Sequence, residues 1–303
     1  MLVILLASGP AARGQQQDFS KVTLKTTAVA TGLYSLEGSG GNIGVSVGKD
    51  AVFLIDDQFA PLTEKVKAAV ADIDPRPIRF LMNTHWHGDH TGGNENLAKI
   101  GVLIFAHDNV RRRLSSPQFI EFLKKEIPAA PEAALPVVTF SETITFHING
   151  DDVEAAHVPS AHTDGDSIIH FQKANVYHTG DIFSSGGYPF IDVSSGGSME
   201  GMIAACDGLL ARVDEKTRLI PGHGPVSDRA TLETYRKMLG GIRDRIQTLL
   251  GEGKTVQQIV EAHPTQEFDG RWAKSFLNGE QFTRIVCDSL AHKAGSLPPP
   301  SGH

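Results

Sequence analysis

Residues 83–93 read Asn-Thr-His-Trp-His-Gly-Asp-His-Thr-Gly-Gly, and six consecutive positions of this segment hold three of the chain's 13 histidines. It places His85, His87 and His90 directly after the apolar run Ile78-Arg-Phe-Leu-Met82, which has the composition of a buried strand. In an extended chain, side chains two positions apart point to the same side, so His85 and His87 can converge on one ion. Bunched histidines are unfavourable unless a cation or hydrogen bonds organise them. The pattern therefore indicates a metal centre.

The glycine inside this stretch indicates a second metal position. Gly88 allows the chain to turn sharply after the first histidine pair. The turn presents Asp89 and His90 toward a second point close to the first. The segment therefore contributes ligands to more than one position.

Three later segments carry isolated histidine or aspartate residues. Residues 159–167 read Pro-Ser-Ala-His-Thr-Asp-Gly-Asp-Ser, residues 176–183 read Val-Tyr-His-Thr-Gly-Asp-Ile-Phe, and residues 220–226 read Ile-Pro-Gly-His-Gly-Pro-Val. Together with residues 83–93, they resemble, in content and in order, the motifs of the metallo-β-lactamase superfamily. The resemblance covers about residues 31–226. It is specific for the fold and the metal site, and much less specific for the substrate.

The resemblance implies an α/β fold, a four-layer αββα sandwich with extra C-terminal helices. Strand-like runs, then helix and strand in alternation, then strands and helices again, agree with two sheets packed face to face. We expect one hydrolase domain over residues 22–294, in which residues 228–294 form a C-terminal helical extension. The tail 295–303 is expected to be disordered.

The same resemblance implies a dinuclear site. One ion would be held by His85, His87 and His162, the other by Asp89, His90 and His223, and Asp181 would reach both. Three neutral imidazoles with an open position are typical of a catalytic rather than a structural zinc site. A carboxylate with two imidazoles suits a second such ion. The expected cofactor is two Zn²⁺ per chain, with iron or manganese not excluded.

The expected reaction is hydrolysis of a carbonyl substrate by a metal-bridging hydroxide, because two neighbouring ions lower the pKa of a bound water toward neutrality. The substrate could be a β-lactam, lactone, ester or thioester. The predicted catalytic residues are Asp89, which orients the nucleophile or accepts its proton, the bridging Asp181, and Tyr188, which could donate to a developing oxyanion or simply pack. In the superfamily, an aspartate at the position of Asp181 is typical of hydroxyacylglutathione hydrolases, lactonases and nucleases, whereas the best-known zinc β-lactamases often carry cysteine there. Hydrolysis of β-lactams nevertheless recurs in members that carry the aspartate.

Two other functions remain open at this point. One is a mononuclear-iron sulfur dioxygenase, because some relatives keep these residues and use few of them. The other is a non-catalytic protein whose metals only brace a binding module. Turnover of an activated ester or lactam after metal loading would separate these classes.

Residues around the ligands have weaker signals. Thr163 could hold a ligand through its hydroxyl, and Asn83 or Thr84 could orient the first histidines. Trp86 is expected to pack beneath the metal loop. Residues 183–197, rich in Gly and Ser, are expected to form a loop that contacts the substrate.

Composition favours a small-molecule substrate. The 303 residues carry a net charge of −7, which argues against nucleic acid because such binders need a basic face. The one short basic run, residues 111–113, is interpreted as a solvated helix face. Cys206 and Cys287 are expected to be buried and free. Nothing in the sequence indicates an oligomeric state.

The N-terminus predicts export. Residues 1–17 begin with a short apolar run and contain Ala12-Arg-Gly14, small residues at both positions that determine cleavage, although no basic residue precedes the run. We expect a periplasmic or secreted protein, and a cytoplasmic one if this segment is not a signal. The run is too short to span a bilayer, and no other stretch qualifies.

Overall fold

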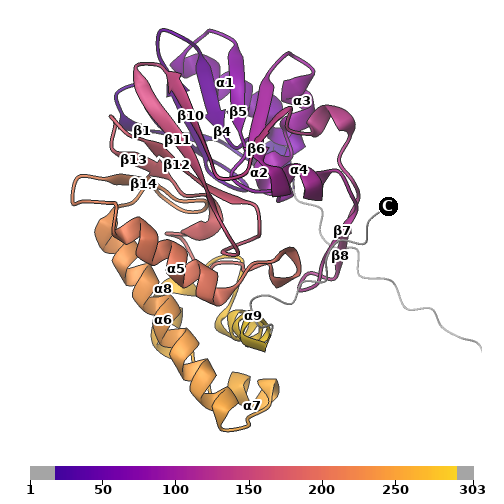
Figure 1. Ribbon diagram of the computed structural model, residues 1–303, viewed down its shortest axis with the longest axis vertical. Helices are drawn as coiled ribbons and strands as arrows, with labels where there is room; N and C mark the ends of the chain where they lie inside the picture. Colours follow the sequence, from indigo (N-terminus) through magenta and orange to yellow (C-terminus); the bar gives the residue numbers. More distant parts are fainter. Residues whose placement is uncertain (1–17, 292–303) are drawn as a thin grey trace, which may run out of the picture.

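The computed structural model describes residues 18–291, and two β-sheets packed face to face form its centre (Figure 1). The larger sheet has the order β1-β2-β3-β4-β5-β6-β9 and the smaller one β10-β11-β12-β13-β14. The strands of the larger sheet are β1 (Lys25–Ala30), β2 (Leu33–Glu37), β3 (Ile43–Val47), β4 (Val52–Ile55), β5 (Ile78–Met82), β6 (Leu103–His107) and β9 (Val138–Phe140). Those of the smaller sheet are β10 (Thr143–Ile148), β11 (Asp151–Val158), β12 (Asp166–Phe171), β13 (Val176–His178) and β14 (Arg218–Ile220).

Strand β4 shows how the layers are built. Its four residues are all buried, because the strand has an apolar partner on each face. Phe53 and Ile55 belong to the apolar cluster between the two sheets, whereas Val52 and Leu54 belong to the cluster under the outer helices. Successive side chains of a strand point to opposite faces, so a strand covered on both sides reads as a continuous apolar run.

Helices cover the outer faces of both sheets. The helices α1 (Thr63–Ile73) and α3 (Asn94–Ala98) cover the larger sheet, and α5 (Met199–Leu210), α6 (Arg229–Gly251) and α9 (Gly279–Ala291) share one apolar cluster with β13 and β14. The short helices are α2 (Gly88–Thr91), α4 (Asp108–Leu114), α7 (Val256–Glu261) and α8 (Gln266–Trp272). Figure 1 shows the C-terminal helices as a block against the smaller sheet. The predicted four-layer sandwich with extra C-terminal helices is confirmed.

The sequence analysis missed one element, a small antiparallel hairpin of β7 (Gln118–Ile120) and β8 (Lys125–Ile127). The hairpin lies between α4 and β9 in the sequence, and Figure 1 shows it projecting from the sandwich near α4. Its turn, Glu121-Phe-Leu-Lys124, contains no Gly, Pro, Asn or Asp, so the usual hairpin signal is missing. The hairpin lines the cavity over the predicted ligands.

Two smaller expectations have definite outcomes. Cys206 and Cys287 are buried and free, as predicted. The basic run is not a uniformly solvated face, because Arg113 forms an ion pair with Asp164 (Nε–Oδ1, 2.7 Å) in the segment that carries His162. This arginine anchors α4 to that segment.

The predicted signal segment, residues 1–17, and the predicted tail, residues 295–303, lie outside the described residues. Within residues 18–291, no helix is long and apolar enough to cross a membrane.

Candidate metal centre

The seven predicted ligands lie together at one edge of the sandwich. The loop after β5 supplies His85, His87, Asp89 and His90, the loop between β11 and β12 supplies His162, and the chain after β13 and β14 supplies Asp181 and His223. Each of the two sheets therefore contributes predicted ligands. The segments after β5, β13 and β14 follow the C-terminal ends of strands that run parallel to a neighbour.

The side chains of His85, His87 and His162 form one cluster, with ligand atoms within 4.8 Å of one another. Their outer nitrogens are fixed by hydrogen bonds. His87 Nε2 donates to Asp192 Oδ2 (3.0 Å), and His162 Nδ1 donates to the carbonyl of Phe190 (2.7 Å). These bonds set the tautomers, so the lone pairs of His87 Nδ1 and His162 Nε2 face the centre of the cluster.

The outer nitrogen of His85 is likewise fixed by a hydrogen bond, in this case to Thr84. The Thr84 hydroxyl donates its hydrogen bond to Asp56 Oδ2 (2.7 Å). Its oxygen therefore accepts from His85 Nδ1 (3.0 Å). His85 Nε2 is buried and has no hydrogen-bond partner. Burial holds the pKa of His85 well below its ordinary value and lowers that of His162 to about 4, so both imidazoles are neutral, the state that binds metals.

A second cluster consists of Asp89, His90 and His223, and Asp181 lies between it and the first. Asp181 Oδ1 is 3.1 Å from His90 Nε2, and Asp181 Oδ2 is 3.2 Å from His223 Nε2 and 3.6 Å from His162 Nε2. Glycines give these groups room. A Cβ at Gly222 would lie 2.0 Å from Asp181 Oδ1, and one at Gly41 would lie 2.1 Å from the His90 ring.

The charges of this second cluster favour a cation. Burial alone would lower the pKa of His90, but the carboxylates of Asp181, Asp89 and Asp56 raise it well above its ordinary value. Burial alone would raise the pKa of Asp181, yet His223 and His90 hold it well below its ordinary value. Without metal, protonated histidines balance the buried carboxylates, and a divalent cation can replace those protons.

These observations test whether metal ions fit the residues present. His87 Nδ1 and His162 Nε2 lie 2.8 Å apart with their lone pairs facing each other, and His85 Nε2 is orphaned beside them. Lone pairs that converge in a buried site are unfavourable without a shared cation. The imidazole and carboxylate donor set suits divalent transition metals, zinc among them. The residues of both clusters therefore fit divalent metal ions.

Two carboxylates that hold the ligands were not found by sequence reasoning. Asp56, which is fully buried after β4, accepts from the backbone N–H of Thr84 (2.7 Å) and from His90 Nδ1 (2.7 Å). Asp192 holds His87, and although burial alone would raise its pKa, that hydrogen bond keeps the pKa below its ordinary value. The available signal for Asp56 was its position at the end of β4, which pairs with β5 beside the first histidines.

The weaker sequence predictions have mixed outcomes. Thr84 does orient His85, as predicted, whereas Asn83 hydrogen-bonds Asn94 (3.1 Å). The Thr163 hydroxyl donates to Asp166 and not to a predicted metal ligand, so the expectation that it holds a ligand is wrong. Trp86 is buried as expected and also lines the cavity described below.

Tyr188 lies at the cavity but does not aim its hydroxyl at the ligands. The hydroxyl donates to Asp269 Oδ1 (2.8 Å) in α8, and burial together with that carboxylate raises the pKa of Tyr188. Its ring stacks on Phe282 at 4.7 Å between centroids. The contacts are those of a packing residue, and the predicted oxyanion role stays a prediction.

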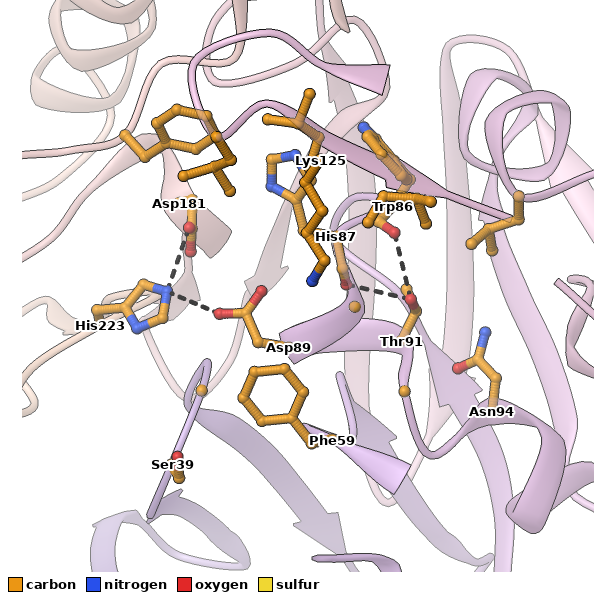
Figure 2. Close-up of a pocket in the computed structure, with 18 of the residues that line it drawn as sticks. Ser39, Phe59, Trp86, His87, Asp89, Thr91, Asn94, Lys125, Asp181 and His223 are labelled. Atoms are coloured by element: carbon orange, nitrogen blue, oxygen red, sulfur yellow. Dashed lines mark hydrogen bonds and ion pairs between the residues drawn. The ribbon is translucent and has the colours of Figure 1, made fainter. Parts of the chain in front are cut away.

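A cavity of about 690 Å³ opens over the two clusters (Figure 2). His87, Asp89, Asp181 and His223 form part of its floor. Its walls are mostly apolar, and they come from Phe59, Trp86, Phe190, Phe276, the hairpin β7–β8 and the segment that follows it to Ala134. The predicted loop 183–197 contributes four of the lining residues, Ser184, Tyr188, Pro189 and Phe190. The centre is therefore reached from an apolar pocket large enough for a small molecule.

The sequence profile of the family described as Metallo-beta-lactamase superfamily matches residues 37–240. The chain belongs to this superfamily. The match spans the segments that supply all seven clustered side chains, so the resemblance stated from the motifs is confirmed. Family membership agrees with the metal-binding chemistry of the clusters.

Individual relatives are distant. A probable metallo-hydrolase of Bacillus subtilis (strain 168), YqgX, is 27% identical over 202 residues, which are 63% of this chain and 92% of that protein. A metallo-beta-lactamase from Pontibacter korlensis superposes with a TM-score of 0.58 at 19% identity, over 72% of this chain and 99% of that one.

A third similar structure extends further along the chain. The sec-alkylsulfatase Pisa1 from Pseudomonas sp. matches with a TM-score of 0.61 at 17% identity and covers 91% of this chain and 52% of its own. These structural likenesses establish the fold.

Proposed function

We propose that this protein is a zinc-dependent hydrolase with two ions per chain that cleaves a carbonyl substrate such as a β-lactam, lactone, ester or thioester. The observation that carries the proposal is the convergence of candidate ligand atoms beside the floor of an apolar cavity, among them His85 Nε2, which is buried and has no hydrogen-bond partner. A centre that only braced the structure would have no need to open on such a cavity.

The proposed roles follow from the contacts. His85, His87 and His162 would hold one ion, Asp89, His90 and His223 the other, and Asp181 would contact both. Two bound zinc ions would polarise the substrate carbonyl and make water a nucleophile at neutral pH. Asp89, whose side chain is 27% exposed, lines the cavity and would orient the attacking water or accept its proton.

Asp192, Asp56 and Thr84 keep the imidazole tautomers that this chemistry requires. The apolar walls exclude bulk water from the substrate, which strengthens the electrostatic interactions at the centre.

A panel of substrates tests the proposal. We expect the zinc-loaded protein to hold about two ions per chain and to hydrolyse at least one of a cephalosporin, a homoserine lactone and an acylglutathione, while a phosphodiester is left intact. Activity should vanish with a chelator and in His85→Ala, and return with zinc in the wild type. His147→Ala, a change at an exposed histidine paired with Asp152, is the matched control and should keep full activity.

Other outcomes favour the alternatives. A single tightly bound iron per chain, with oxygen consumed in the presence of a persulfide, would favour the dioxygenase. Two bound ions with no turnover on any substrate of the panel would contradict a carbonyl hydrolase and favour a binding protein.

We also propose that the protein is exported, on the strength of the N-terminal sequence alone. Expressed in a bacterial host with two membranes, the full chain should appear in the periplasm or medium, with a mature N-terminus near Gln15. N-terminal sequencing of fractionated protein checks this, and an intact Met1 on protein confined to the cytosol contradicts it.

A further inference from the structure

The lining of the cavity contains one lysine, Lys125 at the start of β8, and no arginine. Figure 2 shows its side chain reaching from the hairpin into the cavity toward Asp89 and His87. The neighbouring lysine differs. Lys124 forms an ion pair with Glu121 and lines a separate hollow beside Asp192 and Arg284. The two adjacent lysines of the hairpin therefore line different hollows.

The Lys125 ammonium has no acidic partner among residues 18–291. Three carboxylates line the cavity with it, Asp89, Asp181 and Glu95. Asp89 and Asp181 belong to the metal clusters, and Glu95 forms an ion pair with Lys99 (2.7 Å). With metal ions bound, the positive charge of Lys125 therefore faces the cavity without compensation.

The surroundings of Lys125 are otherwise apolar. Ile120, Leu123 and Ile127 of the same hairpin line the cavity, and Phe190 and Phe276 lie in the same lining. Leu123 and Phe276 are 39% and 62% exposed, so the apolar surface continues to the rim of the pocket. A lone cation among apolar groups binds an anion more strongly than the same cation on a polar surface, because less water competes.

We propose that Lys125 is a specificity-determining residue that binds an anionic group of the substrate. The substrate class is then an amphiphile, in which an apolar body fills the cavity and a carboxylate or similar anion contacts Lys125 while the carbonyl group reaches the metal clusters. This inference rests on the proposed function for the carbonyl, but the anion site itself does not depend on hydrolysis.

Hydrolysis provides the first test. The two substrates are the mono(4-nitrophenyl) ester of suberic acid, which carries one carboxylate, and the same molecule capped as its methyl ester. We expect Lys125→Met to raise the KM for the anionic ester about tenfold or more and to leave the capped ester nearly unchanged, since a hydrogen bond to a charged group is lost only in the first case. Lys125→Arg should retain the preference, and Lys125→Glu should reverse it. Lys124→Met is the matched control and should behave as the wild type.

Binding provides a second test that does not need turnover. In calorimetric titrations of the metal-loaded protein, octane-1-sulfonate, whose sulfonate is a poor metal ligand, should bind about tenfold or more weakly to Lys125→Met, while octan-1-ol binds both proteins alike. This result would stand even if no ester were hydrolysed, so it separates the anion site from the proposed function. Equal losses for the anionic and neutral members of either pair, or no loss with Lys125→Met, would overturn the proposal.

Discussion

We expect Asp181→Asn to fold normally and to keep the ion at His85, His87 and His162. Its affinity for the second ion should fall by at least about 10–100-fold, because losing only a residue that hydrogen-bonds to a metal ligand already lowers metal affinity by this factor. The carboxylate places one oxygen near His90 and the other near His223 and His162. An amide keeps the size but presents only one good oxygen and no charge, so it bridges two cations poorly. Hydrolysis should fall in parallel with the second ion.

The measurement is zinc stoichiometry by elemental analysis, with affinity from competition against a chromophoric chelator. Asp207→Asn, the same chemical change in a carboxylate paired with Arg236 on the surface of α5, is the matched control and should leave both sites intact. If Asp181→Asn retained two ions and near-wild-type turnover, Asp181 would not be the bridge.

The second large effect is expected at Asp56, which contacts no substrate. Its oxygens accept from the Thr84 N–H, the Thr84 hydroxyl and His90 Nδ1, and it is fully buried. Asp56→Ala leaves these donors unpaired, and each buried unpaired group costs about 1–3 kcal/mol. We expect the free energy of unfolding to fall by about 3 kcal/mol or more, and zinc affinity to fall by about 10–100-fold because His90 loses its orienting partner.

Urea unfolding of the metal-free protein and chelator competition measure the two effects separately. The backbone at Asp56 has φ +63°, a conformation that Asn tolerates better than Ala, so Asp56→Asn should lose less stability than Asp56→Ala. Asp72→Ala, on the exposed side of α1, should stay within about 0.5 kcal/mol of the wild type. An unfolding free energy for Asp56→Ala equal to that of this control would contradict the role assigned to the carboxylate.

The sequence was sufficient to identify the side chains that cluster and insufficient to identify their supports. Predicted ligands such as His85 and His87 sit in short motifs whose spacing carries the chemistry, so they can be identified without a structure. Asp56 and Asp192 become supports only because pairing of β4 with β5, and the return of the chain after Phe190, bring them to histidines 34 and 105 positions away. No local pattern records such long-range contacts.

Local signals also failed where a turn lacked its usual residues. The hairpin β7–β8 has none of the common turn residues, and its short strands show too little alternation to be recognised. Lys125 was not predicted as a site residue because the hairpin that positions it was not predicted.

The distribution of ligands over both sheets has a consequence for how the protein matures. His90 is 133 positions from His223, so the second cluster is incomplete until nearly three quarters of the chain has been synthesised and the two sheets have docked. An ion bound there acts as a cross-link that only the docked state can accept. At a free concentration one hundred times its dissociation constant, such an ion adds about 2.7 kcal/mol to the stability of that state. Under the proposed function, metal supply during biosynthesis would set how long a newly made molecule persists, as well as whether it is active.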